Sequence, residues 1–238
     1  MWTRFKLSGS AKGQCLRRGQ TIRRFSGYAH AVLILQMATL AVGLAGIARA
    51  EDAAVSDHDF QAKFDYCKTC HGASGQGFRA YYPIPRLAGQ QTEYLENQLQ
   101  AFSEHRRTNN IMFNVAHVLS PSMEKALVTK FHELNPKPLG GAPKDLVAAG
   151  RKIFEDGIPS ANVPGCTTCH GTDAKGNGQI PRLAGQLHDY ILNKLTNWSK
   201  ERGQNPAQPD ASALMEPIAH GLTEAQIKAV AAYVSTLE

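Results

Sequence analysis

The strongest constraint on the fold is an internal duplication within residues 51–238. The hexapeptide C-K-T-C-H-G at residues 67–72 recurs as C-T-T-C-H-G at residues 166–171. The heptapeptide I-P-R-L-A-G-Q at residues 84–90 recurs without change at residues 180–186. A chain that repeats the same motifs in the same order encodes one folding unit twice, and we expect two similar domains.

Helical periodicity follows each heptapeptide. Apolar residues at i, i+4 and i+7 form one helix face in each copy, namely Leu95, Leu99 and Phe102, then Ile191, Leu195 and Trp198. Each copy continues with M-x-x-x-A-x-x-L-S/T, which starts at Met112 and at Met215. Ser120 followed by Pro predicts a capped helix start, and Thr223-x-x-Gln226 predicts a capping box.

The duplication also sets the domain boundaries. A segment rich in Pro and Gly, residues 137–143, cannot continue a helix and predicts a linker between a first domain (51–136) and a second (144–238). The spacing of the motifs places seven extra residues in the second copy. The composition of residues 203–210 is typical of a loop that holds this insertion.

Residues 1–50 have a different character. Eight Lys and Arg but no acidic residue occur there, residues 31–48 are uncharged, and Ala48-Arg49-Ala50 matches an A-x-A cleavage pattern. We predict an export signal that is cleaved after Ala50; an uncleaved membrane anchor is the alternative. The leader carries the basic excess. The whole chain has 26 Lys and Arg against 20 Asp and Glu, and without the eight in the leader 18 basic residues remain against 20 acidic ones. The rest of the chain gives no electrostatic reason to bind nucleic acid.

The chemistry of both copies lies in the C-x-x-C-H pentad, which is typical of covalent haem attachment. Two thiols bind the haem vinyl groups and the neighbouring imidazole binds the iron. The predicted residues are Cys67, Cys70 and His71, and Cys166, Cys169 and His170. Zinc would need further ligands, a pair of disulfides would leave the histidines unexplained, and a thioredoxin-like motif would need a strand-rich context.

A sixth iron ligand would close each haem to other molecules, and Met is the residue that complements His in cytochromes c. Met112 and Met215 occupy equivalent places in the two copies and are the predicted ligands. In the first copy, other candidates remain open: Met123, His105, His117 and His132.

Together, these motifs resemble the two-haem class I cytochromes c, most closely those of the c4 type. The resemblance implies an all-α protein of two tandem domains, each wrapped around one covalently bound haem. It also implies that the carbonyls of Pro85 and Pro181 accept a hydrogen bond from the ligating histidines, and it makes Arg86 and Arg182 candidates for contact with the haem propionates. The first domain departs from the pattern around Phe131 and in its first helix, which lacks a G-x-x-x-F spacing.

The resemblance implies a function in electron transfer and no enzymatic activity. The leading hypothesis is a periplasmic cytochrome that carries single electrons between respiratory proteins, for example from a quinol-oxidising complex to a terminal oxidase or reductase. Alternatives are the electron-accepting subunit of a periplasmic dehydrogenase and a two-haem peroxidase. The expected partners are redox proteins, and no binding of nucleic acid is expected. Peripheral association with a membrane is compatible with this hypothesis. The protein is expected to be either a monomer or a subunit of a redox complex.

Overall fold

The computed structural model describes residues 54–202 and 211–238, which belong to one compact unit. The described residues form helices joined by loops, with four isolated β-bridges and no extended strand. The expected leader (1–50) and the expected insertion (203–210) lie outside the described residues. Among the described helices, none combines the length and the apolar character that a membrane crossing requires.

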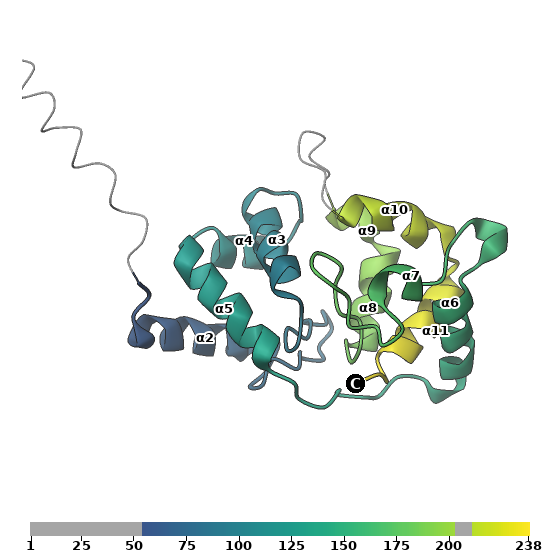
Figure 1. Ribbon diagram of the computed structural model, residues 1–238, viewed down its shortest axis with the longest axis horizontal. Coiled ribbons are helices and arrows are strands. Elements are labelled where there is room, and N and C mark those ends of the chain that lie inside the picture. Colours follow the sequence, from purple (N-terminus) through teal and green to yellow (C-terminus); the bar gives the residue numbers. More distant parts are fainter. Residues whose placement is uncertain (1–53, 203–210) are drawn as a thin grey trace, which may run out of the picture. The chain divides into compact units, whose positions relative to one another are not determined.

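Four of the described helices belong to the first domain, as Figure 1 shows. They are α2 (Asp57–His71), α3 (Thr92–Ser103), α4 (Asn110–Ala116) and α5 (Pro121–Glu133). Helix α2 packs on α5, and α3 packs on both α4 and α5. Their buried faces form one core, made of Phe64, Leu95, Met123, Leu127, Val128 and Phe131.

The second domain begins with η1 (Lys144–Leu146) and α6 (Val147–Asp156) and continues with η2 (Pro159–Ala161) and α7 (Thr167–His170). The remaining helices are α8 (His188–Thr196), α9 (Trp198–Glu201), α10 (Ser212–Gly221) and α11 (Glu224–Val234). Helix α11 packs on α6 and α8, and α10 packs on α8 and α9. This domain has a separate core that includes Phe154, Ile191, Val230 and Val234.

The structure confirms the helix starts that the sequence predicts. The Ser120 side chain accepts from the Met123 N–H at the start of α5, and a complete capping box joins Thr223 and Gln226 at the start of α11. The predicted face that ends at Trp198 is interrupted, because α8 ends at Thr196 and Trp198 begins α9. Asn197 separates them, and its side-chain amide donates to the Asn193 carbonyl, a local bond that competes with helix propagation.

The first helix distinguishes the two copies, as the missing G-x-x-x-F spacing suggests. In the first domain α2 runs unbroken into the C-x-x-C-H segment, whereas α6 and α7 are separate. Gly150 of α6 lies so close to α11 that a Cβ atom there would collide with the Ala229 carbonyl oxygen. The aromatic pairs are nevertheless equivalent: Phe64 packs on Phe131, and Phe154 packs on Tyr233.

The two domains also share buried polar contacts. Arg107, which follows α3, donates from Nη1 to Gln98 Oε1 (2.8 Å) and from Nη2 to the Tyr190 hydroxyl in α8 (2.7 Å). The Thr108 N–H donates to the Glu201 carbonyl (2.8 Å). These bonds join the first domain to α8 and α9 of the second.

Candidate functional site

The histidines of the two C-x-x-C-H segments are the last residues of their helices. His71 ends α2 and His170 ends α7, and only 7% and 5% of their surfaces are exposed. Each helix stops at the following glycine, Gly72 (φ +88°) or Gly171 (φ +79°), a backbone conformation that an L side chain rarely adopts. The chain therefore turns away at once and leaves each imidazole in the interior of its domain.

Both imidazoles are held in the same way. His71 Nδ1 lies 2.9 Å from the Pro85 carbonyl oxygen, and His170 Nδ1 lies 2.9 Å from that of Pro181. A carbonyl can only accept, so each Nδ1 carries a proton, and in the neutral imidazole the lone pair is then on Nε2. Among the described residues, neither Nε2 has a hydrogen-bond partner. Burial lowers the pKa of both imidazoles, which favours the neutral form that binds a metal.

A glycine allows each proline-bearing loop to approach its histidine. The Gly77 and Gly176 N–H groups donate to the His71 and His170 carbonyls, both at 2.8 Å. Both glycines have positive φ, and a Cβ atom on Gly77 would lie 2.9 Å from the backbone nitrogen of Arg86. A larger residue would therefore push the proline carbonyl away from the imidazole.

The four described cysteines are free thiols on the same helical turn as the histidine of each pair. Cys67 and Cys166 are half-buried, whereas Cys70 and Cys169 are exposed. Burial raises the pKa of Cys67 and of Cys166 to about 11. No cluster of three or more His, Cys, Asp and Glu side chains that could hold a metal ion occurs in the described chain. One buried imidazole beside two thiols fits a covalent haem, which brings its own four nitrogen ligands.

The two candidate methionines lie in equivalent helices. Met112 is in the first turn of α4, where its N–H donates to the Asn109 side chain (2.9 Å), and Met215 is in α10. Both side chains are half-buried and belong to neither of the two cores. Met123, by contrast, is 8% exposed and packs in the first core.

The three competing histidines are all exposed. His105 and His117 stack on the two faces of Phe113, and His117 Nδ1 also lies 2.8 Å from the Phe113 carbonyl. His132 Nδ1 lies 2.8 Å from the Gln90 carbonyl. None of them is buried as His71 is, and Met112 remains the predicted ligand because its place in the repeat is equivalent to that of Met215.

Arg86 and Arg182 are buried and bind protein acceptors. Arg86 donates to the carbonyls of Ala88 (2.9 Å) and Pro136 (2.8 Å), and Arg182 donates from Nε to the Ala184 carbonyl (3.0 Å). Burial and the neighbouring Arg182 lower the pKa of Arg86 to about 10. Both side chains therefore brace the loop that carries the proline carbonyl.

The sequence did not reveal the role of Gln90 and Gln186. Both are buried and bind backbone atoms of the opposite domain. The available signal was that both glutamines belong to the heptapeptide that recurs unchanged.

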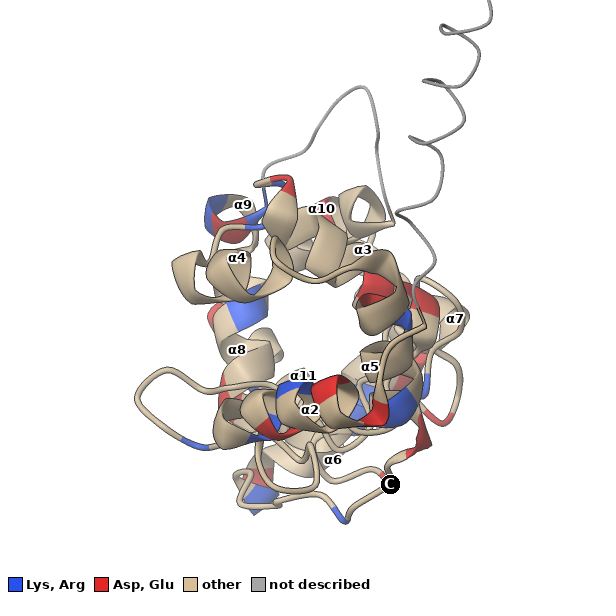
Figure 2. Ribbon diagram, turned by 90° about the vertical axis from the view of Figure 1, so that its left-hand side faces the viewer, with Lys and Arg blue, Asp and Glu red and all other residues tan. Residues whose placement is uncertain are grey.

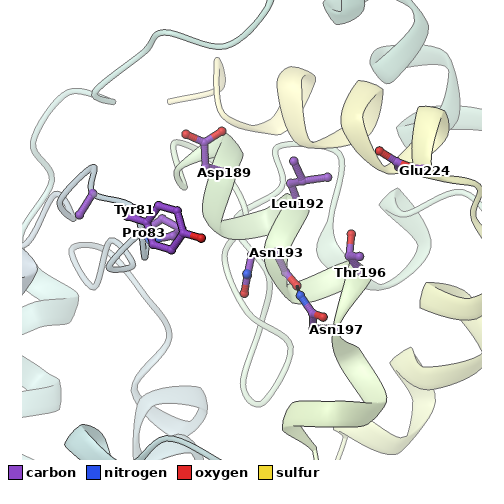
Figure 3. A pocket seen from close by; sticks show the side chains of 9 residues that line it. Tyr81, Pro83, Asp189, Leu192, Asn193, Thr196, Asn197 and Glu224 are labelled. Atoms are coloured by element: carbon purple, nitrogen blue, oxygen red, sulfur yellow. Dashed lines mark hydrogen bonds between the residues drawn. The ribbon is translucent and has the colours of Figure 1, made fainter.

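A shallow hollow lies away from these residues (Figure 3). Tyr81 and Pro83 line it from one side, and Asp189, Asn193 and Asn197 line it from α8 and its end. It contains no cysteine, histidine or methionine of the candidate sites, so it does not belong to them.

The chain is similar to known proteins over both copies of the repeat. The sequence profile of the Cytochrome c family matches residues 61–136 and 147–238. Cytochrome c-552 of Acidithiobacillus ferridurans is 37% identical over 200 residues, which are 80% of this chain and 83% of that protein. The thiosulfate dehydrogenase electron acceptor of Thiomonas intermedia (strain K12) is 34% identical over 71% of this chain and 77% of its own.

Among solved structures, the chain resembles cytochrome c4 of Acidithiobacillus ferrooxidans, with a TM-score of 0.63 and 36% identity. The similarity covers 73% of this chain and 99% of that one. It therefore extends over both copies of the repeat.

Proposed function

Because the chain belongs to the cytochrome c family and binds two covalent c-type haems in tandem domains, we propose that it carries single electrons between respiratory proteins in the periplasm. It is an electron-transfer protein rather than an enzyme. The haem iron supplies the one-electron couple between ferric and ferrous states. We assign the two domains to residues 51–136 and 144–238, joined by residues 137–143.

The chain's own residues attach and orient the cofactor in this proposal. Cys67 and Cys70 would bind the first haem through thioethers and His71 would bind its iron; Cys166, Cys169 and His170 would do the same in the second domain. Met112 and Met215 complete the coordination. A thioether ligand raises the potential and keeps small molecules from the iron, as an electron carrier requires.

The observation that carries the proposal is the pair of buried histidines. In each, burial lowers the pKa and so favours the neutral form, a proline carbonyl 2.9 Å away fixes Nδ1, and Nε2 has no hydrogen-bond partner among the described residues. A fixed imidazole orientation is what second-shell partners give to a metal ligand. The same geometry occurs independently in both domains, which supports two equivalent redox centres.

The second candidate is an electron-accepting subunit of a periplasmic dehydrogenase. The name of the Thiomonas intermedia relative, a thiosulfate dehydrogenase electron acceptor, favours it. Such a subunit would use the same haem ligands, so the two hypotheses differ only in the electron donor. Figure 2 shows acidic and basic residues interspersed along the helices in view, so their distribution along the ribbon does not distinguish the two partners.

The periplasmic location rests on the leader. Residues 1–50 have the basic start, uncharged middle and A-x-A end of an export signal. Covalently bound haem, which is typical of exported cytochromes, fits that interpretation. N-terminal sequencing of the protein recovered from the periplasmic fraction tests it. A chain that starts at Glu51 is expected, and a chain that keeps residues 1–50 in the membrane fraction would favour an anchor.

Optical spectra test the coordination. We expect two haems per chain, the Met-to-iron charge-transfer band in the oxidised protein, and no binding of carbon monoxide after reduction. Met112→Ala and Met215→Ala should each open one haem to carbon monoxide, whereas Met123→Leu, which conserves volume in the core, should leave both closed. Carbon monoxide binding by the unaltered protein would bring the peroxidase hypothesis forward.

Reduction assays separate the two electron-transfer hypotheses. The purified oxidised protein is mixed with membranes that contain a quinol-oxidising complex, or with a thiosulfate dehydrogenase and thiosulfate. Rapid reduction by the membranes alone supports the shuttle. Rapid reduction only in the presence of the dehydrogenase supports the subunit.

A further inference from the structure

The peptide unit between Pro85 and Arg86 makes two hydrogen bonds, one to each domain. Its carbonyl oxygen, on Pro85, accepts from His71 Nδ1 at 2.9 Å. Its N–H, on Arg86, donates to Gln186 Oε1 of the second domain at 2.8 Å. A single planar group thus connects the candidate iron ligand of the first domain to a side chain of the second.

The duplication makes the same connection in the opposite direction. The Pro181 carbonyl accepts from His170 Nδ1 at 2.9 Å, and the Arg182 N–H on that same peptide donates to Gln90 Oε1 of the first domain at 2.6 Å. Each domain therefore supplies a glutamine to the histidine-binding peptide of the other.

Each glutamine amide is fixed in orientation. Gln186 Nε2 donates to the Arg86 carbonyl and Gln90 Nε2 donates to the Arg182 carbonyl, both at 3.0 Å. An inverted amide would place its NH₂ group against an N–H and its oxygen against a carbonyl, so only the observed orientation satisfies both atoms. Both glutamines are buried, with 5% and 6% of their surfaces exposed, and water does not readily replace these bonds.

We propose that Gln90 and Gln186 are positioning residues that tune the haem of the opposite domain; this rests on the proposed roles of His71 and His170 as iron ligands. When a peptide N–H donates a hydrogen bond, its carbonyl oxygen becomes a stronger acceptor. A stronger hydrogen bond donated by Nδ1–H to the carbonyl oxygen makes the imidazole a more basic ligand, which favours ferric iron. Contact between the domains thereby lowers both reduction potentials.

The prediction is that the effect crosses between domains. Gln186 belongs to the second domain, yet it binds the peptide that holds His71. Replacing it with Met, a side chain of similar length, removes its two bonds to the Arg86 backbone and also the bond that its oxygen accepts from the Leu187 N–H within the second domain. The potential of the haem in the first domain should rise in Gln186→Met, and that of the second haem should stay near its original value. Gln90→Met is the matched control, in which the second haem should respond instead.

The experiment uses the full two-haem protein. NMR-monitored redox titration, with haem signals assigned to domains through sequence-assigned amides, gives each potential separately. Hydrogen exchange gives a readout that does not depend on redox chemistry: the Arg86 amide should exchange about tenfold faster in Gln186→Met, because one buried hydrogen bond is lost. The Arg182 amide should change only in Gln90→Met.

A shift confined to the mutated residue's own domain, equal shifts in both haems, or no shift would each overturn the inference. If Gln186→Met does not accumulate, Gln186→Asn retains the amide but is one methylene too short to reach Arg86, and the same outcome is expected. In the unaltered protein, an Arg86 amide that exchanges as fast as an exposed loop amide would also refute it. Failure of the proposed function is distinct, since it would appear as an abnormal spectrum of the unaltered protein.

Discussion

Replacing Tyr190 with Phe removes one oxygen atom from the contact between the domains and should lower the free energy of unfolding by about 2 kcal/mol. The Tyr190 hydroxyl accepts from Arg107 Nη2 at 2.7 Å. Arg107 is 7% exposed, and its guanidinium lies over the Phe102 ring at 4.7 Å from the centroid. Without the hydroxyl, a donor of a buried cation loses its acceptor where water has little access. Bonds to charged groups contribute about 1.5–3 kcal/mol, which sets the expected range.

Urea denaturation of the two-haem protein, followed by circular dichroism, measures this loss. Tyr233→Phe is the matched control, because Tyr233 is also half-buried in the second domain but its hydroxyl makes no hydrogen bond among the described residues. The control should change the free energy by less than about 0.5 kcal/mol, the usual range for substitutions that break no such bond. Equal effects of the two substitutions would refute the role of the Arg107 contact.

Three further outcomes follow from the structure. Cys67→Ala should abolish stable accumulation of the chain, measured as yield of haem-containing protein, because a small domain depends on its attached haem for its core. Gly150→Ala should cost about 3 kcal/mol in urea denaturation, because its Cβ would collide with the Ala229 carbonyl. Burial, and to a smaller extent the neighbouring Glu96, raise the pKa of Glu124 above the ordinary carboxyl value. Ionisation of Glu124 therefore opposes folding once the pH rises above that ordinary value. Glu124→Gln should therefore raise the Tm at pH 7, and the gain should vanish below the ordinary carboxyl pKa.

Local signals allowed most of the helices to be predicted. The caps at Ser120 and Thr223 involve residues within three positions of each other, so the sequence contains all of the information. The break at Asn197 was missed because apolar spacing alone favoured a continuous helix through Trp198. The unbroken α2 could not be derived either, since its length depends on how the first helix packs on α5 and not on its own periodicity.

The candidate site likewise contains residues that local sequence predicts and residues that only the fold brings together. The cysteines and His71 are adjacent in sequence and were predicted from spacing. The proline acceptor came from family resemblance, because no rule of spacing links residues 14 positions apart, as His71 and Pro85 are. The contact of Gln186 with Arg86 spans 100 positions and was missed entirely. Only the fold brings such residues together.

The unchanged heptapeptide is best explained by two constraints that act on one short segment. In each copy the proline carbonyl must accept a hydrogen bond from a histidine of its own domain. The backbone of the next residue must at the same time bind a glutamine of the other domain. Because the arginine offers only its backbone to that glutamine, its side chain remains free to brace the loop, as Arg86 does on Ala88. A pseudo-symmetric contact uses the same surface twice, so each copy of the segment must both provide a glutamine and receive one. Divergence in either copy would therefore disturb the histidine of both domains.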